Sequence, residues 1–236
     1  TDKTGTLTTN EISVTRIFVN GKIIHVSGAR YEHTGNFYFR GMGISRGEMM
    51  ENGMDALFDA CVLCNNAGLI PPKTDTDRWS IIGDPTEAAM LVMAAKGGLN
   101  IEERRDALPR IGQLPFEAVR KRMTSINLID GQSHAYVKGA PREVLELCTQ
   151  ILNKGKGESL TDSMRNIILS KNDSMAWDGL RVLGVAYRPI KKKKKFTVEN
   201  TEKDLIFLGL VGMMDPPRPE VPKAIKACHN AGIRVA

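Results

Sequence analysis

The sequence predicts an α/β (α+β) fold in which an antiparallel sheet, flanked by helices, is inserted into an incomplete doubly wound domain. Hairpins indicate the antiparallel part, because Asn20-Gly21 and Asp130-Gly131 each separate two strand-forming runs and suit tight two-residue turns. The doubly wound part is indicated near the carboxyl end. There, a continuous apolar run over 205–214 precedes a helical pattern and Gly232, as in the strand–helix–strand unit of a parallel sheet.

The composition is that of a globular protein. Of the 236 residues, 42% are hydrophobic and 25% are charged, so the chain can bury a core. The net charge of +6 is spread along the chain; it does not indicate nucleic acid and suits an anionic small ligand at least as well. No apolar run reaches the roughly 18 residues that a membrane-spanning helix needs. The cysteines are too few and scattered for a disulfide framework, which favours a reducing, cytosolic compartment.

Strands and helices alternate in the expected order of elements. The first half is expected to contain a hairpin at 12–25, a strand at 37–39, a helix at 54–66, a strand at 79–82 and a helix from Pro85 to Gly97-Gly98. The second half is expected to contain a hairpin at 123–137, a helix at 141–148, a helix from Thr161 to about Trp177 and a strand at 182–187. The lysine run 191–195 is expected to be a solvated loop, because like charges repel and favour extended chain.

We expect three segments along the chain. Residues 1–10 and 208–236 are expected to be two pieces of the doubly wound domain, and residues 11–207 the inserted domain. Because the first residue is not Met and the last residues fall within a predicted strand, we expect the chain to be a piece of a longer protein.

The sharpest motif is Asp2-Lys3-Thr4-Gly5-Thr6-Leu7-Thr8 at the amino end. An aspartate followed by hydroxyl residues and a glycine can offer a carboxylate nucleophile to a phosphoryl group, while hydroxyls and backbone N–H groups hold the phosphate oxygens. The product would be an acyl phosphate. Thr4 lies two residues after the aspartate, and a threonine there cannot activate water as a general base. The motif therefore favours an intermediate that persists.

This motif resembles the phosphorylation signature of P-type ATPases, the ion pumps that form an aspartyl-phosphate from ATP. Further segments resemble that family's motifs in the same order, namely Gly83-Asp84-Pro85-Thr86-Glu87-Ala88, Phe116 with Arg120-Lys121-Arg122-Met123, Lys138-Gly139-Ala140-Pro141, Gly179-Leu180-Arg181-Val182-Leu183 and Met214-Asp215-Pro216-Pro217-Arg218. The calcium-pump and sodium/potassium-pump branch is the most similar. The resemblance implies that the inserted domain binds nucleotide and that the split domain is HAD-like and carries the aspartate.

The resemblance also implies the site residues. Phe116 would stack on adenine, Lys138 with Gly139 and Ala140 would line the adenine pocket, and Glu87 beside Thr86 would accept a hydrogen bond from the adenine amino group. Lys121 and Arg181 would meet the phosphates, and Met123 and Leu183 would be apolar walls. Asp2, Lys3 and Thr4 would be catalytic, with Asp2 and Thr4 in an incomplete Mg²⁺ site. Asp215, Pro216 and Arg218 would belong to the hinge and the phosphorylation domain.

The implied function is the ATP-binding cytoplasmic segment of a cation pump, with ATP and Mg²⁺ as cofactors. We expect a soluble, monomeric fragment that binds ATP without turning it over, because the family's later phosphoryl-transfer motifs are absent from this sequence. Its partners would be the remaining phosphorylation, actuator and transmembrane domains, and no nucleic acid. The motif style favours calcium as the ion. Two alternatives stay open: a phosphatase of the HAD-like superfamily, and a stand-alone nucleotide-binding module.

Overall fold

The computed structural model describes residues 6–9, 11–28, 31–74, 78–190, 195–216, 218 and 220–234. The predicted catalytic and Mg²⁺-binding residues Asp2, Lys3 and Thr4 lie outside this part of the chain, as do residues 191–194 of the lysine run. The predicted nucleotide-binding and hinge residues lie within it.

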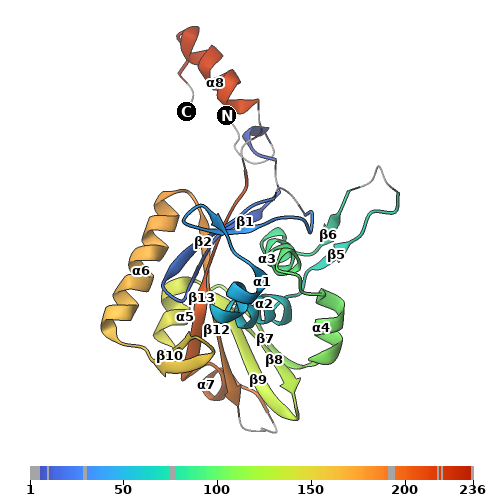
Figure 1. The fold of residues 1–236 in the computed structure, drawn as a ribbon, viewed down its shortest axis with the longest axis vertical. Coiled ribbons are helices and arrows are strands. Elements are labelled where there is room, and N and C mark those ends of the chain that lie inside the picture. Colours follow the sequence, from blue (N-terminus) through green and yellow to red (C-terminus); the bar gives the residue numbers. More distant parts are fainter. Residues whose placement is uncertain are drawn as a thin grey trace.

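One large sheet forms the centre of the molecule (Figure 1). Among the described residues it has eleven strands, and the order of the main path is β4-β3-β2-β1-β13-β12-β9-β8-β7, with β10 and β11 beside the start of β13. All neighbours in it are antiparallel except β10 and β13. The expected antiparallel sheet is therefore confirmed.

The strands of the large sheet are β1 (Ser13–Val19), β2 (Lys22–Val26), β3 (Phe37–Phe39), β4 (Met42–Gly43), β7 (Arg110–Glu117), β8 (Arg122–Ile129), β9 (Gln132–Gly139), β10 (Cys148–Asn153), β11 (Lys156–Ser159), β12 (Arg181–Ile190) and β13 (Leu205–Met214). A separate antiparallel pair is made by β5 (Gly68–Ile70) and β6 (Ser80–Ile82).

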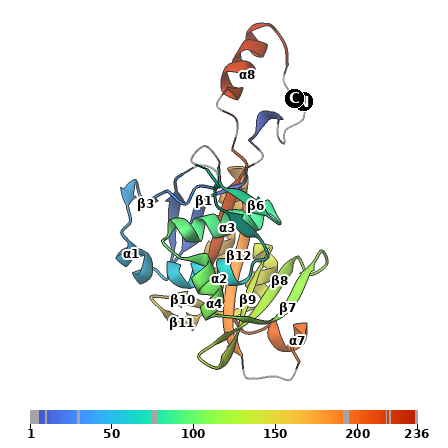
Figure 2. The same ribbon diagram turned by 90° about the vertical axis from the view of Figure 1, so that its right-hand side faces the viewer.

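Helices cover both faces of the sheet (Figures 1 and 2). The helices are α1 (Arg46–Glu51), α2 (Met54–Leu63), α3 (Pro85–Lys96), α4 (Ile101–Ala107), α5 (Pro141–Glu146), α6 (Asp162–Trp177), α7 (Val198–Thr201) and α8 (Val221–Asn230). On one face, α2 and α3 share a hydrophobic cluster with the sheet. On the other face, α5 and α6 share a second cluster with it.

The two predicted hairpin turns are confirmed. Asn20 and Gly21 both have positive φ, 47° and 73°, and join β1 to β2 with Val19 opposite Lys22. Asp130 and Gly131 repeat this geometry between β8 and β9, with φ of 49° and 77°. Such turns need two left-handed residues in succession, which Asn-Gly and Asp-Gly supply at low cost.

Helix limits follow the predicted capping residues. The hydroxyl of Thr161 accepts a hydrogen bond from the N–H of Met164 at 3.3 Å and so caps the start of α6, as predicted. Gly179, with φ of 79°, follows the end of that helix. The predicted helix at 54–66 is three residues shorter, since α2 ends at Leu63.

The pairing of β13 differs from the expectation. The apolar run is a strand, but β13 pairs antiparallel with β1 and β12 and is parallel only to β10, so the prediction that β13 is a strand of a parallel sheet is wrong. The physical reason is burial on both faces. Leu208 and Val211 belong to the cluster on the α2–α3 face, whereas Phe207 and Leu210 belong to the cluster on the α5–α6 face. A continuous apolar run indicates that a strand is buried on both faces, but it does not indicate whether the strand is parallel or antiparallel to its neighbours. The second strand of the predicted unit would follow Gly232, and residues 235 and 236 lie outside the described part of the chain.

The segments that flank the sheet meet beyond the end of β13. The N–H of Thr9 donates to the carbonyl of Pro216 at 3.1 Å, and the N–H of Arg218 donates to the carbonyl of Leu7 at 2.9 Å. The Asp215 carboxylate accepts from the hydroxyl of Thr8 at 2.5 Å. From this junction α8 projects away from the body of the molecule (Figure 1), and none of its residues is buried. No helix in the described ranges is both long and apolar enough to cross a membrane.

The two-sided burial of β13 predicts a large loss of stability on truncation. Phe207 is 1% exposed, so Phe207→Ala should lower the free energy of unfolding by about 3–5 kcal/mol, through lost burial and a cavity. Urea unfolding followed by circular dichroism measures this. Trp177→Ala is the matched control, because Trp177 is 90% exposed and its removal should change the free energy of unfolding by less than about 0.5 kcal/mol. Equal losses in the two variants would contradict the assignment of β13 as the centre of the core.

Candidate functional site

One cleft contains every residue that the sequence predicts to bind ATP. It has a volume of about 600 Å³ and lies where α3 begins, β9 ends, β12 begins and β7 turns into β8. The β7–β8 turn is here residues 115–122, which include the last residues of β7 and the first of β8. Its lining residues are Asp84, Thr86, Glu87, Phe116, Lys121, Met123, Lys138, Gly139, Ala140, Pro141, Arg181, Val182 and Leu183. Residues from four separate parts of the sequence therefore meet in one concave surface.

The first turn of α3 brings Thr86 and Glu87 to the cleft. The carboxylate of Asp84 accepts hydrogen bonds from the N–H groups of Thr86 at 2.8 Å and Glu87 at 3.2 Å, which caps the helix. Pro85 occupies the first helical position, where its missing N–H costs nothing. The motif Asp84-Pro85-Thr86-Glu87 thus fixes where the helix starts and which side chains it presents there.

A largely buried ion pair lies deep in the cleft. The ammonium of Lys138 is 2.8 Å from Oε1 of Glu87, and the two side chains are only 6% and 14% exposed. The second oxygen of Glu87 accepts from the N–H of Asn66 at 2.8 Å. In such an environment each charge depends on the other, since a single buried charge would lack both water and a partner.

Gly139 permits a close approach of two backbone segments beside this pair. A Cβ atom at Gly139 would lie 2.4 Å from the carbonyl oxygen of Lys121 and 2.4 Å from Cβ of Arg122. The same carbonyl of Lys121 accepts from the N–H of Ala140 at 2.9 Å. Only glycine fits at this position, and the contact ties the β7–β8 turn to the end of β9.

The mouth of the cleft presents an uncovered aromatic ring. Phe116 lies near the end of β7 and is 63% exposed. Met123 on β8 is buried in the hydrophobic cluster that α2 and α3 share with the sheet, and Leu183 on β12 packs against that cluster. Both side chains line the cleft, so its walls are apolar there. The arrangement can hold a flat apolar group against the ring.

Two cations line the cleft as well. The ammonium of Lys121 donates to Glu143 at 2.6 Å; this hydrogen bond raises the pKa of Lys121 and lowers the pKa of Glu143. Arg181 donates from Nη1 to the hydroxyl of Thr86 at 3.0 Å. Because that hydroxyl is neutral, the contact leaves the charge of Arg181 available to an anion.

Comparison with known proteins shows the family of the chain. A family model described as P-type ATPase, cytoplasmic domain N, matches residues 53–220, which is most of the chain. The chain belongs to the family of P-type ATPase cytoplasmic N domains.

Relatives of this N domain match it from end to end. The chain is 38% identical over 234 residues to the "Calcium-transporting ATPase" of Bacillus subtilis (strain 168), covering 99% of this chain and 26% of the relative. It is 37% identical over 240 residues to the "Cation-transporting ATPase pma1" of Synechocystis sp., with the same coverage. It is 28% identical over 246 residues to the "Sodium/potassium-transporting ATPase subunit alpha-4" of Rattus norvegicus, covering 99% of this chain and 23% of the relative. The chain thus spans about a quarter of the length of these relatives.

The predicted hinge residues of this N domain are not part of the cleft lining. Asp215, Pro216 and Arg218 follow β13 and make the junction with residues 7–9 described above. The structure therefore separates the predicted residues into two groups, one in the cleft and one at the junction.

Sequence reasoning missed one acidic residue close to the cleft. Glu202 has no exposed side-chain surface and binds both Arg120 and Arg122, which flank Lys121 in the β7–β8 turn. No local signal points to it, because Glu202 lies in a polar stretch between α7 and β13 and about eighty residues from its partners.

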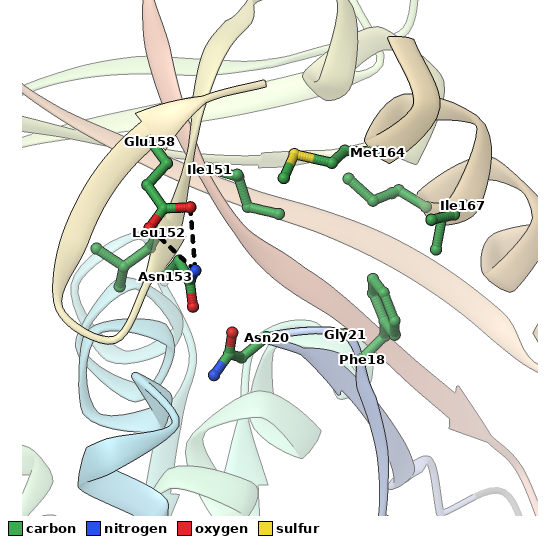
Figure 3. Close-up of a pocket in the computed structure, with 10 residues that line it drawn as sticks. Phe18, Asn20, Gly21, Ile151, Leu152, Asn153, Glu158, Met164 and Ile167 are labelled. Carbon is green, nitrogen blue, oxygen red and sulfur yellow. Dashed lines mark hydrogen bonds between the residues drawn. The ribbon is translucent and has the colours of Figure 1, made fainter. Parts of the chain in front are cut away.

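A second, smaller cavity of about 220 Å³ lies between α6, the β10–β11 pair and the β1–β2 turn (Figure 3). Phe18, Ile151, Met164 and Ile167 give it a mostly apolar lining (Figure 3). Its carboxylate, from Glu158, accepts from the side-chain amide of Asn153 at 3.0 Å. The residues around it are all different from those predicted for the nucleotide.

The ion pair in the cleft yields a test of this geometry. Glu87→Gln should lower the free energy of unfolding by about 3 kcal/mol, because it leaves the ammonium of Lys138 buried without a counter-charge. The double variant Glu87→Gln/Lys138→Met should recover most of that loss, since it removes both charges. Urea unfolding of the two variants measures the difference. If the double variant were less stable than Glu87→Gln, the loss in Glu87→Gln would not come from the uncompensated charge of Lys138.

Proposed function

We propose that the cleft is an ATP site and that the chain serves as the nucleotide-binding segment of a cation-pumping P-type ATPase. The observation that supports this most is the convergence of residues 86–87, 116–123, 138–140 and 181–183 on one cleft of about 600 Å³. A volume of this size suits a nucleotide-sized ligand. The family to which the chain belongs supports the same assignment.

The adenine would occupy the apolar part of the cleft. Phe116 would stack on the base, and Met123 and Leu183 would form the walls. Glu87 would accept from the exocyclic amino group, and Lys138 would line the pocket beside it. Ala140 would let the backbone come close to the ligand, because it carries no bulky side chain. Gly139 would act through the close approach of Lys121 and Arg122, which occupy the space of its missing Cβ.

The phosphates would lie toward Lys121 and Arg181. Arg181 already carries a charge that its neutral partner, Thr86, does not compensate. Lys121 would exchange its contact with Glu143 for a contact with a phosphate; its side chain is 59% exposed, so this exchange costs little. An ammonium and a guanidinium together suit a polyphosphate.

The parent protein would couple ATP hydrolysis to cation transport across a membrane. We propose Asp2 as the phosphorylated residue with Lys3 and Thr4 beside it, and Mg²⁺ as the metal that Asp2 and Thr4 would help to hold. The relatives are named as calcium-, cation- and sodium/potassium-transporting ATPases, and calcium is the ion that we favour. The phosphorylation, actuator and transmembrane domains would be the partners, and the cleft would face the cytoplasm.

The division into an inserted domain and a split HAD-like domain is also proposed. The backbone hydrogen bonds between residues 7–9 and 216–218 support a shared second domain, because they hold its two segments side by side. All of β13 belongs to the large sheet. We therefore propose that the inserted domain ends after Met214, and not before Leu208.

The decisive test of the ATP site is Phe116→Ala. Loss of the stacking surface should weaken ATP binding by about 5- to 150-fold, which corresponds to roughly 1–3 kcal/mol. Stability should change little, because the ring is 63% exposed. Titration with ATP followed by chemical-shift changes measures both affinity and fold. Val119→Ala is a matched control in the same turn, since Val119 is 93% exposed and outside the cleft lining. Unchanged affinity in Phe116→Ala would remove the proposed site.

A second test concerns chemistry. Both carboxylates of the cleft are engaged, Asp84 in capping α3 and Glu87 with Lys138, so the cleft itself offers binding and not phosphoryl transfer. This chain should therefore form no stable acyl phosphate with Mg-ATP. Incubation with labelled ATP, followed by acid precipitation and hydroxylamine treatment, measures it. Recovery of a hydroxylamine-sensitive phosphate on Asp2 would contradict the expectation.

A further inference from the structure

Glu202 is a buried carboxylate between α7 and β13. Its side chain has no exposed surface. The C-terminal end of α7 holds its backbone, because the N–H of Glu202 donates to the carbonyl of Val198 at 2.9 Å. Three residues later the chain enters β13, the central strand of the sheet. The carboxylate is thus attached to a rigid part of the fold.

Three donors satisfy this carboxylate. Oε1 accepts from Nη1 of Arg120 at 2.5 Å and from the hydroxyl of Thr124 at 2.7 Å. Oε2 accepts from Nε of Arg122 at 2.6 Å. The two arginine side chains are 12% and 14% exposed. Charge-assisted hydrogen bonds of this length, shielded from water, are among the strongest in proteins.

The same arginines hold the β7–β8 turn together. Arg120 donates from Nη2 to the carbonyl of Pro115 at 2.6 Å and from Nε to the carboxylate of Glu117 at 2.9 Å. Arg122 donates from Nη1 to the carbonyl of Arg120 at 3.1 Å. Each guanidinium therefore joins the Glu202 carboxylate to backbone atoms of the turn.

This turn carries two of the proposed nucleotide-binding side chains. Phe116 follows Pro115, whose carbonyl Arg120 binds, and Lys121 lies between the two arginines. The backbone of Lys121 has a positive φ of 51°, which is costly for a residue with a side chain. Since Phe116 is 63% exposed, the position of its ring depends on the backbone that bears it.

We propose that Glu202 is a positioning residue for the nucleotide cleft, acting through Arg120 and Arg122 on the turn that presents Phe116 and Lys121. The inference rests on the proposed ATP site. A turn fixed before the ligand arrives loses less conformational freedom on binding, so the affinity is higher. It also assigns Arg120 and Arg122 a role in holding the turn, and leaves the phosphates to Lys121 and Arg181.

The experiment replaces the carboxylate by its uncharged isostere. Glu202→Gln keeps the shape of the side chain but turns an NH₂ group toward a guanidinium, so the turn should loosen. ATP affinity, measured by chemical-shift titration, should fall by roughly three- to tenfold, as expected when side chains must be ordered on binding. Asp59→Asn is the matched control. Asp59 binds Nε and Nη2 of Arg104 between α2 and α4, outside the cleft lining, and its loss should leave ATP affinity unchanged.

A double-mutant cycle separates positioning from general loosening. If Glu202 acts through the turn, the loss in Glu202→Gln should largely disappear in the background of Phe116→Ala or of Lys121→Ala, because the positioned group is already absent. The proposal would be overturned by any of three results. These are losses of ATP affinity that add in both backgrounds, an unchanged ATP affinity in Glu202→Gln, and an equal loss of ATP affinity in Asp59→Asn. If Glu202→Gln does not fold, Arg122→Lys can be tested in its place. This variant keeps the positive charge but loses the hydrogen bond from Nε of Arg122 to Glu202.

The unmodified chain distinguishes this proposal from the one on which it rests. If the unmodified chain does not bind ATP, the proposed ATP site fails. If it binds ATP and Phe116→Ala weakens the binding while Glu202→Gln does not, only the positioning role of Glu202 fails.

Discussion

The burial of β13 on both faces is the constraint on which the rest of this structure depends. Phe207 and Leu210 pack toward α5 and α6, whereas Leu208 and Val211 pack toward α2 and α3, so a single strand belongs to both hydrophobic clusters. Its neighbours β12 and β1 pair antiparallel with it on its two sides. Just before its first residue lies Glu202, and just after its last residue lies Asp215. The strand therefore links the surroundings of the cleft to the junction with residues 7–9.

The cleft combines rigid and adjustable contacts. Its inner part is rigid, because the capped start of α3, the pair Glu87–Lys138 and the close approach at Gly139 leave little room for movement. The outer part contains Phe116, which is largely exposed, and Lys121, whose contact with Glu143 lies at the surface. A ligand would thus meet inner contacts that are already formed. The positions of the outer side chains, Phe116 and Lys121, would depend on how firmly the β7–β8 turn is held.

The sequence predicted those features that depend on neighbouring residues. The two hairpin turns and the start of α6 were predictable because a dipeptide or a capping residue determines them locally. The residues of the cleft were predictable through motif resemblance, and the structure brings them together. Their roles toward a nucleotide stay a prediction until binding is measured.

Features that depend on distant contacts were not predictable in the same way. The direction of β13 was predicted wrongly, because apolar residues report burial and carry no information about the partner strand. Strand β7 was missed because Pro115 and a poor alternation argue against a strand; at the edge of a sheet, beside a register shift, a proline is tolerated. Glu202 was missed because nothing near it in the chain indicates two arginine partners.

The ion pair deep in the cleft has a consequence for the direction in which a ligand can enter. Glu87 offsets the charge of Lys138, so this pair carries almost no net charge, whereas the contact of Arg181 with the neutral hydroxyl of Thr86 does not offset the charge of Arg181. A molecule with an uncharged aromatic head and an anionic tail would therefore be favoured with its head beside the pair and its tail toward Arg181. In the reversed orientation the anionic tail would lie at a pair with almost no net charge and would lose the attraction of Arg181, so that orientation would be disfavoured.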